Sequence, residues 1–339
     1  MSPGVWAEEM QPREIEPLLA ELGALGVRLH LALPAAQLGD PELASLTRRA
    51  ADSGVETHAW LLLPRADGYW IGKRNASLGK EAVLSLLRWR SSPGGPCFGG
   101  LSIDLEPPLW RTTELRTHLG RRPWRALGWL RHNLDPGCLD LARRELAEAL
   151  EAARAAGLHR HAVTYPMVLD QAESSTALED ALDLVVTGLD WDEISVMVYQ
   201  TVFSQVLGRW LGAGLVRSYA ESAVQRWAER AGLDLGVVGD GGVALDPGHR
   251  YPSPRDLHAD VAAALSAGIP SARIRVYGLA GTAEELARWL DFRAISPQRP
   301  RRSPRAQMLR ALVSLADRGL AFTLRTRRGF RASARAGDP

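Results

Sequence analysis

Two acids that could do chemistry lie in one short apolar stretch, residues 99–107, with the sequence GGLSIDLEP. If this stretch is a strand, its side chains alternate between two faces, so Asp104 and Glu106 point to the same side as Ser102. A carboxylate in a buried strand is costly unless it is paired or hydrogen-bonded, which indicates that this face lines a polar cavity. Adjacent carboxylates also raise each other's pKa. The pattern suits general acid catalysis, although loop capping or pairing with arginines would also explain an isolated acid pair.

The rest of the chain alternates between apolar runs and amphipathic stretches. Strands are predicted at residues 5–8, 27–33, 56–63, 100–106, 159–165, 194–199, 233–238 and 273–279. Helices are predicted at 12–25, 41–53, 78–89, 138–156, 178–184, 218–231, 254–267 and 282–292. Because each return to a parallel strand needs a crossover, about eight such repeats predict an α/β fold of the (β/α)8 type, a TIM barrel. A doubly wound sheet is the alternative, but no G-x-G-x-x-G follows the first strand.

Charge separates the chain into two parts. The barrel is expected over residues 1–295, and residues 296–339 form a Pro/Arg-rich linker and a basic tail with one helix at 306–318. The formal net charge is only +2, yet residues 299–339 hold eleven arginines and two acids, so the body is acidic. This balance gives no reason to expect a nucleic-acid partner. The tail suits either contact with an acidic surface or a solvated end that packs one helix on the barrel.

The sequence also bears on compartment. No run approaches the length of a membrane span, and the first residues have neither the basic start nor the apolar stretch of a signal peptide. As written, the chain is expected to be cytoplasmic, with export only if a signal segment precedes it. The two cysteines form neither a disulfide framework nor a metal-binding spacing.

In barrels of this type the active site lies where the strands end. The residues at the ends of the predicted strands include acids and aromatic rings. They include no serine or cysteine nucleophile with a histidine base and no lysine for a Schiff base. Aromatic rings stack on sugar faces and carboxylates bind sugar hydroxyls, so a carbohydrate is the expected ligand. Glu106, nearer the mouth, is the expected general acid and Asp104 its deeper partner. The expected substrate-binding residues are Glu8, Trp60, Trp110, Tyr165, Tyr199, Gln200, Asp240 and Tyr277.

Two motifs resemble family 18 glycoside hydrolases, the chitinase-like (β/α)8 barrels, whose fourth strand carries D-G-x-D-x-D-x-E. Residues 99–106 match its glycine, its last aspartate and its glutamate, and residues 197–200, MVYQ, are similar to the M-x-Y-D of the family's sixth strand. The resemblance implies that the substrate's own 2-acetamido oxygen attacks the anomeric carbon. Asp104 would orient that group, Tyr199 would hydrogen-bond it and Glu106 would protonate the leaving oxygen, while Gln200 replaces the family's acid.

The chain departs from the family at three positions. Gly99 and Ser102 replace the first two aspartates, and Tyr277 is the single aromatic residue on the last strand, where the family usually places a tryptophan. A family 25 lysozyme-like barrel, whose fourth strand also carries D-x-E, is an alternative that would favour peptidoglycan and would use Glu8 as a further acid. A catalytically silent sugar-binding barrel is another.

A divalent-metal barrel is a further alternative. Its ligands would be Asp104, Glu106 and Asp240 with His161 or His249, but these histidines lack the close spacing of a metal motif. No metal or other cofactor is therefore expected. The insert at residues 107–136, rich in arginine and tryptophan, either covers the site as a lid or packs beside it.

Overall fold

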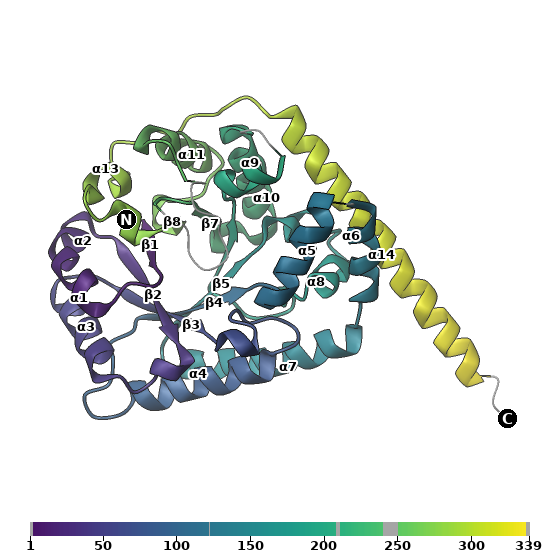
Figure 1. Cartoon of the computed structure of the whole chain (residues 1–339), viewed down its shortest axis with the longest axis horizontal. Helices are drawn as coiled ribbons and strands as arrows, with labels where there is room; N and C mark the ends of the chain where they lie inside the picture. The colour runs from purple at the N-terminus through teal and green to yellow at the C-terminus, as the bar shows by residue number, and fades with distance from the viewer. Residues whose placement is uncertain (1–2, 122, 208–210, 240–249, 337–339) are drawn as a thin grey trace.

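The computed structural model describes residues 3–121, 123–207, 211–239 and 250–336 (Figure 1). Within these residues, parallel strands close into a barrel in which each strand pairs with its neighbours in the chain and the last pairs with the first. The predicted (β/α)8 barrel is thereby confirmed. The strands are β1 (Gly4–Ala7), β2 (Arg28–Pro34), β3 (Thr57–Leu62), β4 (Gly100–Leu105), β5 (His159–Thr164), β6 (Glu193–Met197), β7 (Ala231–Leu235) and β8 (Ile274–Tyr277).

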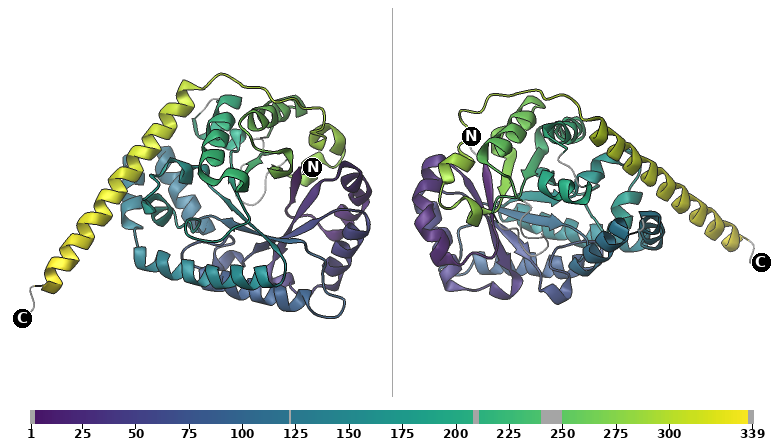
Figure 2. Two further views of the ribbon diagram at one scale, coloured as in Figure 1. Left: turned by 180° about the vertical axis from the view of Figure 1, so that it is seen from behind. Right: turned by 45° about the horizontal axis from the view of Figure 1, so that its top comes forward.

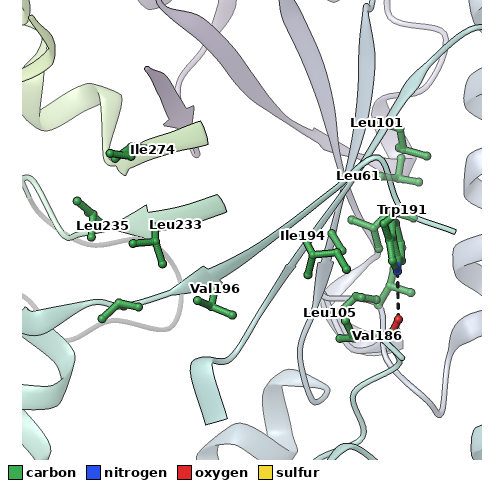
Figure 3. Packing of buried hydrophobic residues seen from close by; sticks show 14 of the residues in the cluster. Leu61, Leu101, Leu105, Val186, Trp191, Ile194, Val196, Leu233, Leu235 and Ile274 are labelled. Carbon is green, nitrogen blue, oxygen red and sulfur yellow. Dashed lines mark hydrogen bonds between the residues drawn. The ribbon is translucent and has the colours of Figure 1, made fainter. Parts of the chain in front are cut away.

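The outward face of the barrel strands is apolar. Leu61, Leu101, Ile194 and Leu233 are fully or almost fully buried on this face. Figure 3 shows Leu61, Leu101 and Ile194 around Trp191, and Leu233 beside Leu235. Burying these branched side chains between strands and helices supplies the main driving force for the fold. The inward face carries the polar side chains that form the site.

Helices surround the strands as predicted, with shifted ends. The described helices are α1 (Pro12–Ile15), α2 (Leu19–Leu25), α3 (Pro41–Asp52), α4 (Ala76–Arg90), α5 (Leu109–Arg121), α6 (Pro123–His132), α7 (Pro136–Ala155), α8 (Ala177–Ala181), α9 (Gln200–Leu207), α10 (Ala213–Trp227), α11 (Pro254–Ser266), α12 (Leu279–Thr282), α13 (Leu286–Leu290) and α14 (Pro304–Ala336).

Several of the predicted helix boundaries were wrong. The predicted helix at 282–292 is two short helices, α12 and α13, and the one at 178–184 ends at Ala181. The predicted helix at 218–231 runs too far, because Ala231 already belongs to β7. The predicted start at residue 138 is late, since the Asp135 side chain accepts a hydrogen bond from the Cys138 backbone N–H at 3.1 Å and Pro136 opens α7. The helix at 12–25 is interrupted by a 3₁₀ turn, Glu16–Leu18, around Pro17, whose ring nitrogen has no hydrogen to donate.

Helix α14 is much longer than the predicted helix at 306–318. Its first half lies against α6, α8 and α10, and its second half extends beyond the barrel (Figures 1 and 2). Arg310 anchors it by donating to Asp170 at 2.6 Å, and Asp317 accepts from the Ser175 hydroxyl at 2.8 Å. Contact of this basic helix with an acidic surface stays a prediction. Among the described residues, no helix combines the length and apolarity that crossing a membrane requires.

Candidate active site

A hydrogen-bonded polar network fills the half of the barrel interior nearest the strands' N-terminal ends. Arg275 on β8 pairs with Glu193 on β6 at 2.7 Å and donates from Nε to His30 Nε2 at 3.0 Å. The other ring nitrogen of His30 lies 2.9 Å from the Ser102 hydroxyl on β4. Burial, followed by the positive charge of Arg275, lowers the pKa of His30 well below its usual range, so this imidazole is neutral.

The network continues across the barrel from Ser102. The Ser102 hydroxyl lies 3.1 Å from Nδ1 of His161, whose Nε2 lies 2.8 Å from the Ser195 hydroxyl. Ser195 donates to one oxygen of Asp234, and the Trp6 indole N–H donates to the other at 2.7 Å. Each of these side chains has a partner, as buried polar groups require. The network forms a firm polar floor beneath the site.

Asp104 and Glu106 lie above this floor, where β4 ends. Both are almost completely buried, at 5% and 7% exposure. Burial raises the pKa of Asp104 well above its usual range, and the negative charges of Glu106 and Asp234 and a hydrogen bond with Glu106 raise it further. Asp104 therefore keeps a proton to higher pH than an ordinary aspartate, and the two carboxyl groups form a hydrogen-bonded pair that can hold a proton between them.

Glu8 follows β1 and adds a third carboxyl group to the mouth of the barrel. The hydroxyl of Tyr69 donates to Glu8 Oε1 at 2.5 Å, and the hydroxyl of Tyr277 donates to Oε2. Burial raises the pKa of Glu8, although the two tyrosine hydrogen bonds offset part of the rise. Glu8 thus fixes the two rings that border the mouth.

Tyr199 completes the group at the end of β6. Burial, together with the charges of Asp234 and Asp104, raises the pKa of its hydroxyl far above the usual value, so it remains a hydrogen-bond donor at any physiological pH. Its ring centroid lies 5.7 Å from that of Tyr277. Gly236 makes room for both rings, because a Cβ there would lie 3.1 Å from each residue.

These groups line one cavity of about 770 Å³ that begins inside the mouth of the barrel. No lysine, arginine or histidine is among its described lining residues. Its inner end holds carboxyl groups and aromatic rings, which come from Trp6, Glu8, Trp60, Trp70, Asp104, Glu106, Tyr165, Tyr199 and Tyr277. Further out its wall is built by the insert helices α5 and α6 and by α14, so the insert borders the cavity.

The structure brings most of the predicted site residues together. Glu8, Trp60, Asp104, Glu106, Tyr165, Tyr199 and Tyr277 all line the cavity. Gln200 does not: its amide is buried and donates to Asp260 at 3.2 Å. Trp110 does not line it either and is 46% exposed on α5. Asp240 lies outside the described residues.

The described residues contain no group of three or more acids, histidines and cysteines arranged to hold a metal ion. His161, which the metal-barrel alternative used, has both ring nitrogens next to serine hydroxyls. The other two residues of that alternative, Asp240 and His249, lie outside the residues that the structure describes.

Sequence reasoning missed Trp6 at the inner end of the cavity and Asp234 in the buried network beneath it. Trp6 lies on the inward face of β1 and packs edge-to-face on Trp60, with ring centroids 4.9 Å apart. Asp234 lies within the apolar run of β7, and its charge acts on Asp104. The sequence did contain a signal for Asp234: it is an acid within an apolar strand, which is the criterion that selected Asp104.

Comparison with known proteins gives no family for this chain. No family model matches the chain, and no curated protein matches it. The solved structures similar to it include D-psicose 3-epimerase with D-tagatose from Clostridium cellulolyticum H10, at 12% identity over 96% of this chain and 99% of that chain with a TM-score of 0.43. Another D-psicose 3-epimerase structure, in the presence of D-fructose, is similar at 12% identity over 95% of this chain and 98% of that chain, with a TM-score of 0.41.

Triosephosphate isomerase from Bartonella henselae is similar at 11% identity, over 82% of this chain and 91% of that chain, with a TM-score of 0.36. At these identities and TM-scores the likenesses carry no conclusion about this chain. Since no family model matches, the resemblance to family 18 glycoside hydrolases stays a prediction.

Proposed function

We propose that this protein is a glycosidase that cleaves a glycan of N-acetylated or related sugars, with Glu106 as proton donor and Asp104 as its partner. The observation that carries the proposal is the pair of buried, hydrogen-bonded carboxyl groups at the C-terminal end of β4, facing a cavity without a cationic side chain among its described lining. Glycosidic cleavage needs one carboxylic acid that is protonated near neutral pH, and such surroundings favour the protonated form.

The proposed roles of the side chains are those that the resemblance to family 18 glycoside hydrolases implies. Glu106 gives its proton to the glycosidic oxygen, and the bond from that oxygen to the anomeric carbon breaks with its electron pair. The 2-acetamido oxygen of the same sugar then bonds to the anomeric carbon. Asp104 stabilises the positive charge that spreads over the acetamido group, and the Tyr199 hydroxyl donates a hydrogen bond to it. Water, deprotonated by Glu106, then bonds to the anomeric carbon as the bond from that carbon to the acetamido oxygen breaks, which releases the sugar and restores the acid.

Two further acids support Asp104 from other strands. The charges of Asp234 on β7 and of Glu8 after β1 both raise its pKa. The chain lacks the first two aspartates of the family 18 motif. Ser102 stands at one of those positions, and its hydroxyl is within hydrogen-bond distance of His30 and His161. Asp234 therefore supplies negative charge near Asp104 that the fourth strand itself does not carry.

The test compares the wild type with Glu106→Gln on a fluorogenic panel of N-acetylglucosamine oligomers, other β-glycosides and peptidoglycan. The wild type is expected to release the fluorophore, and Glu106→Gln to lower kcat by about 10²- to 10⁴-fold while the Kd for an uncleaved oligomer stays the same. Glu145→Gln, a change on the outer helix α7, is the matched control and should keep full activity.

Three other results would decide against the proposal. Equal cleavage by the wild type and Glu106→Gln would remove Glu106 from the acid role. Binding without cleavage by either protein would favour a sugar-binding barrel, the alternative that the missing aspartates support. Cleavage confined to peptidoglycan would favour the lysozyme-like alternative.

A further inference from the structure

The cavity changes character along its length. Its inner end presents Glu8, Asp104 and Glu106, whereas the part that extends over the insert and α14 is lined almost entirely by aliphatic and aromatic side chains. Leu115 and Leu130 come from the insert, Leu182 from the segment after α8, and Leu312 and Leu315 from α14. One continuous cavity thus joins a carboxyl-rich end to an apolar end.

The few polar groups in the apolar part already have partners. The Tyr219 hydroxyl donates to Asp170 at 2.9 Å, and the Thr112 hydroxyl donates to the Pro107 carbonyl at 3.3 Å. Sugar hydroxyls placed against such a wall would lose their hydrogen bonds to water without replacement, which is unfavourable. An apolar chain would instead gain free energy from leaving water.

The apolar part also reaches the protein surface. Leu312 and Leu315 line the cavity yet are 58% and 63% exposed, and Met308, one turn earlier on α14, is 63% exposed. A chain longer than the cavity can therefore continue outward along this helix. The cavity does not limit its occupant to the length that is enclosed.

We propose that the natural substrate is an amphiphile, a saccharide linked to a long apolar chain. The chain lies against Leu130, Leu182 and Leu315 while the glycosidic bond reaches Asp104 and Glu106. The reaction in this inference rests on the proposed glycosidase function, but the ligand class rests on the cavity alone. The two can therefore fail separately.

The experiment uses butyl, hexyl and octyl β-N-acetylglucosaminides, each below its micelle-forming concentration. Their Kd values are measured from the fluorescence of tryptophans, three of which, Trp6, Trp60 and Trp70, line the cavity, and kcat/KM from release of the sugar. Each methylene buried is expected to lower Kd by about threefold to fourfold, so octyl should bind well over tenfold more tightly than butyl.

A matched pair of glycine variants locates the chain. Gly319 lies on α14 at the cavity and Gly128 on α6 away from the cavity lining, and a Cβ at either position would meet no atom within 4 Å. Gly319→Trp fills the apolar part and is expected to abolish the preference for octyl over butyl without weakening butyl binding. Gly128→Trp should retain the wild-type preference, and thermal unfolding verifies that both variants are folded.

The outcomes separate the two proposals. A Kd that does not depend on chain length in the wild type overturns the inference, and so does a preference that survives in Gly319→Trp. Cleavage of short glycosides with no gain from the chain would leave the glycosidase standing and remove the amphiphile. Binding that depends on chain length, without any cleavage, would support the amphiphilic ligand and contradict the glycosidase.

Discussion

Two buried acidic regions of this protein are neutralised in opposite ways. Near α4 and α8, Asp180 and Asp183 are almost inaccessible to water, and cations surround them. Lys73 lies 2.5 Å from Asp180 and 3.3 Å from Asp183, and Arg111 lies 2.8 Å from Asp183. At the mouth of the barrel, by contrast, Asp104 and Glu106 face a cavity with no cation among its described lining residues.

The difference separates a structural role from a chemical one. In the first region, burial raises the pKa of Asp180 and the charge of Lys73 offsets part of the rise, so the pairs hold segments together. In the second region, burial and neighbouring negative charge both raise the pKa of Asp104. Protons take the place of cations there, and protons can be transferred to a substrate.

The largest expected effect comes from breaking the paired region. Lys73→Met leaves Asp180 and Asp183 short of a buried cation and is expected to lower the free energy of unfolding by about 3–5 kcal/mol. Chemical denaturation measures this loss. The control is Lys80→Met, which removes the other lysine of the chain, one that forms pairs with Glu145 and Glu148 on the outer surface of α7. Equal losses in the two variants would contradict the distinction.

The sequence was sufficient for the fold because barrel strands carry local signals. Apolar runs that end at Pro34 or before Pro64, and helices that end before Gly54 or Gly157, mark the units without any knowledge of contacts. The end of α10 carried no such signal, since Ala231 and its neighbours fit the helical pattern as well as the strand of β7. Only pairing with β6 and β8 decides it.

The site was predictable where it depends on strand ends and alternation. These two rules place Glu8, Asp104, Glu106 and Tyr199 on one cavity. On β7 the strand-end rule selected Asp240 instead of Asp234, because the predicted strand at 233–238 places Asp234 near its start, whereas the strand itself ends at Leu235. The apolar wall was beyond them, because it forms only when helix α14, roughly two hundred residues after β4, docks beside the insert helices.

A buried acid without a cationic partner should cost stability, and Asp104→Asn tests this. A folded-state pKa above the ordinary value means that Asp104 stabilises the fold only below its ordinary pKa of 3.8, and that this contribution is lost as pH rises through the folded-state value. At pH 8 the asparagine variant is therefore expected to be more stable by about 1 kcal/mol, and nearly inactive. Denaturation at pH 5 and pH 8 should show the gain growing with pH.

Glu193, an acid inside the barrel that pairs with an arginine, is expected to change the free energy of unfolding in the opposite direction. Glu193→Gln weakens the partner of Arg275, which is fully buried 2.7 Å away, and should lower the free energy of unfolding. If Asp104→Asn also lowered the free energy of unfolding, both acids would be structural. The contrast between acids that pair with cations and acids that face the cavity would then be removed.

The smallest expected effect concerns how the charge of Asp234 influences the pKa of Asp104. Burial raises the pKa of Asp234 to about 6, so Asp234 is mostly charged at neutral pH, and its charge raises the pKa of Asp104. Asp234→Asn removes that charge, and the high-pH limb of kcat/KM should move to lower pH by about one unit, because the shared proton is lost earlier. Asp260→Asn is the control: burial raises the pKa of Asp260 to about 7, but this acid is held by Tyr251 and Gln200 and does not line the cavity. A limb that stays in place in Asp234→Asn, or moves equally in both variants, would show that proton sharing at β4 does not depend on the charge from β7.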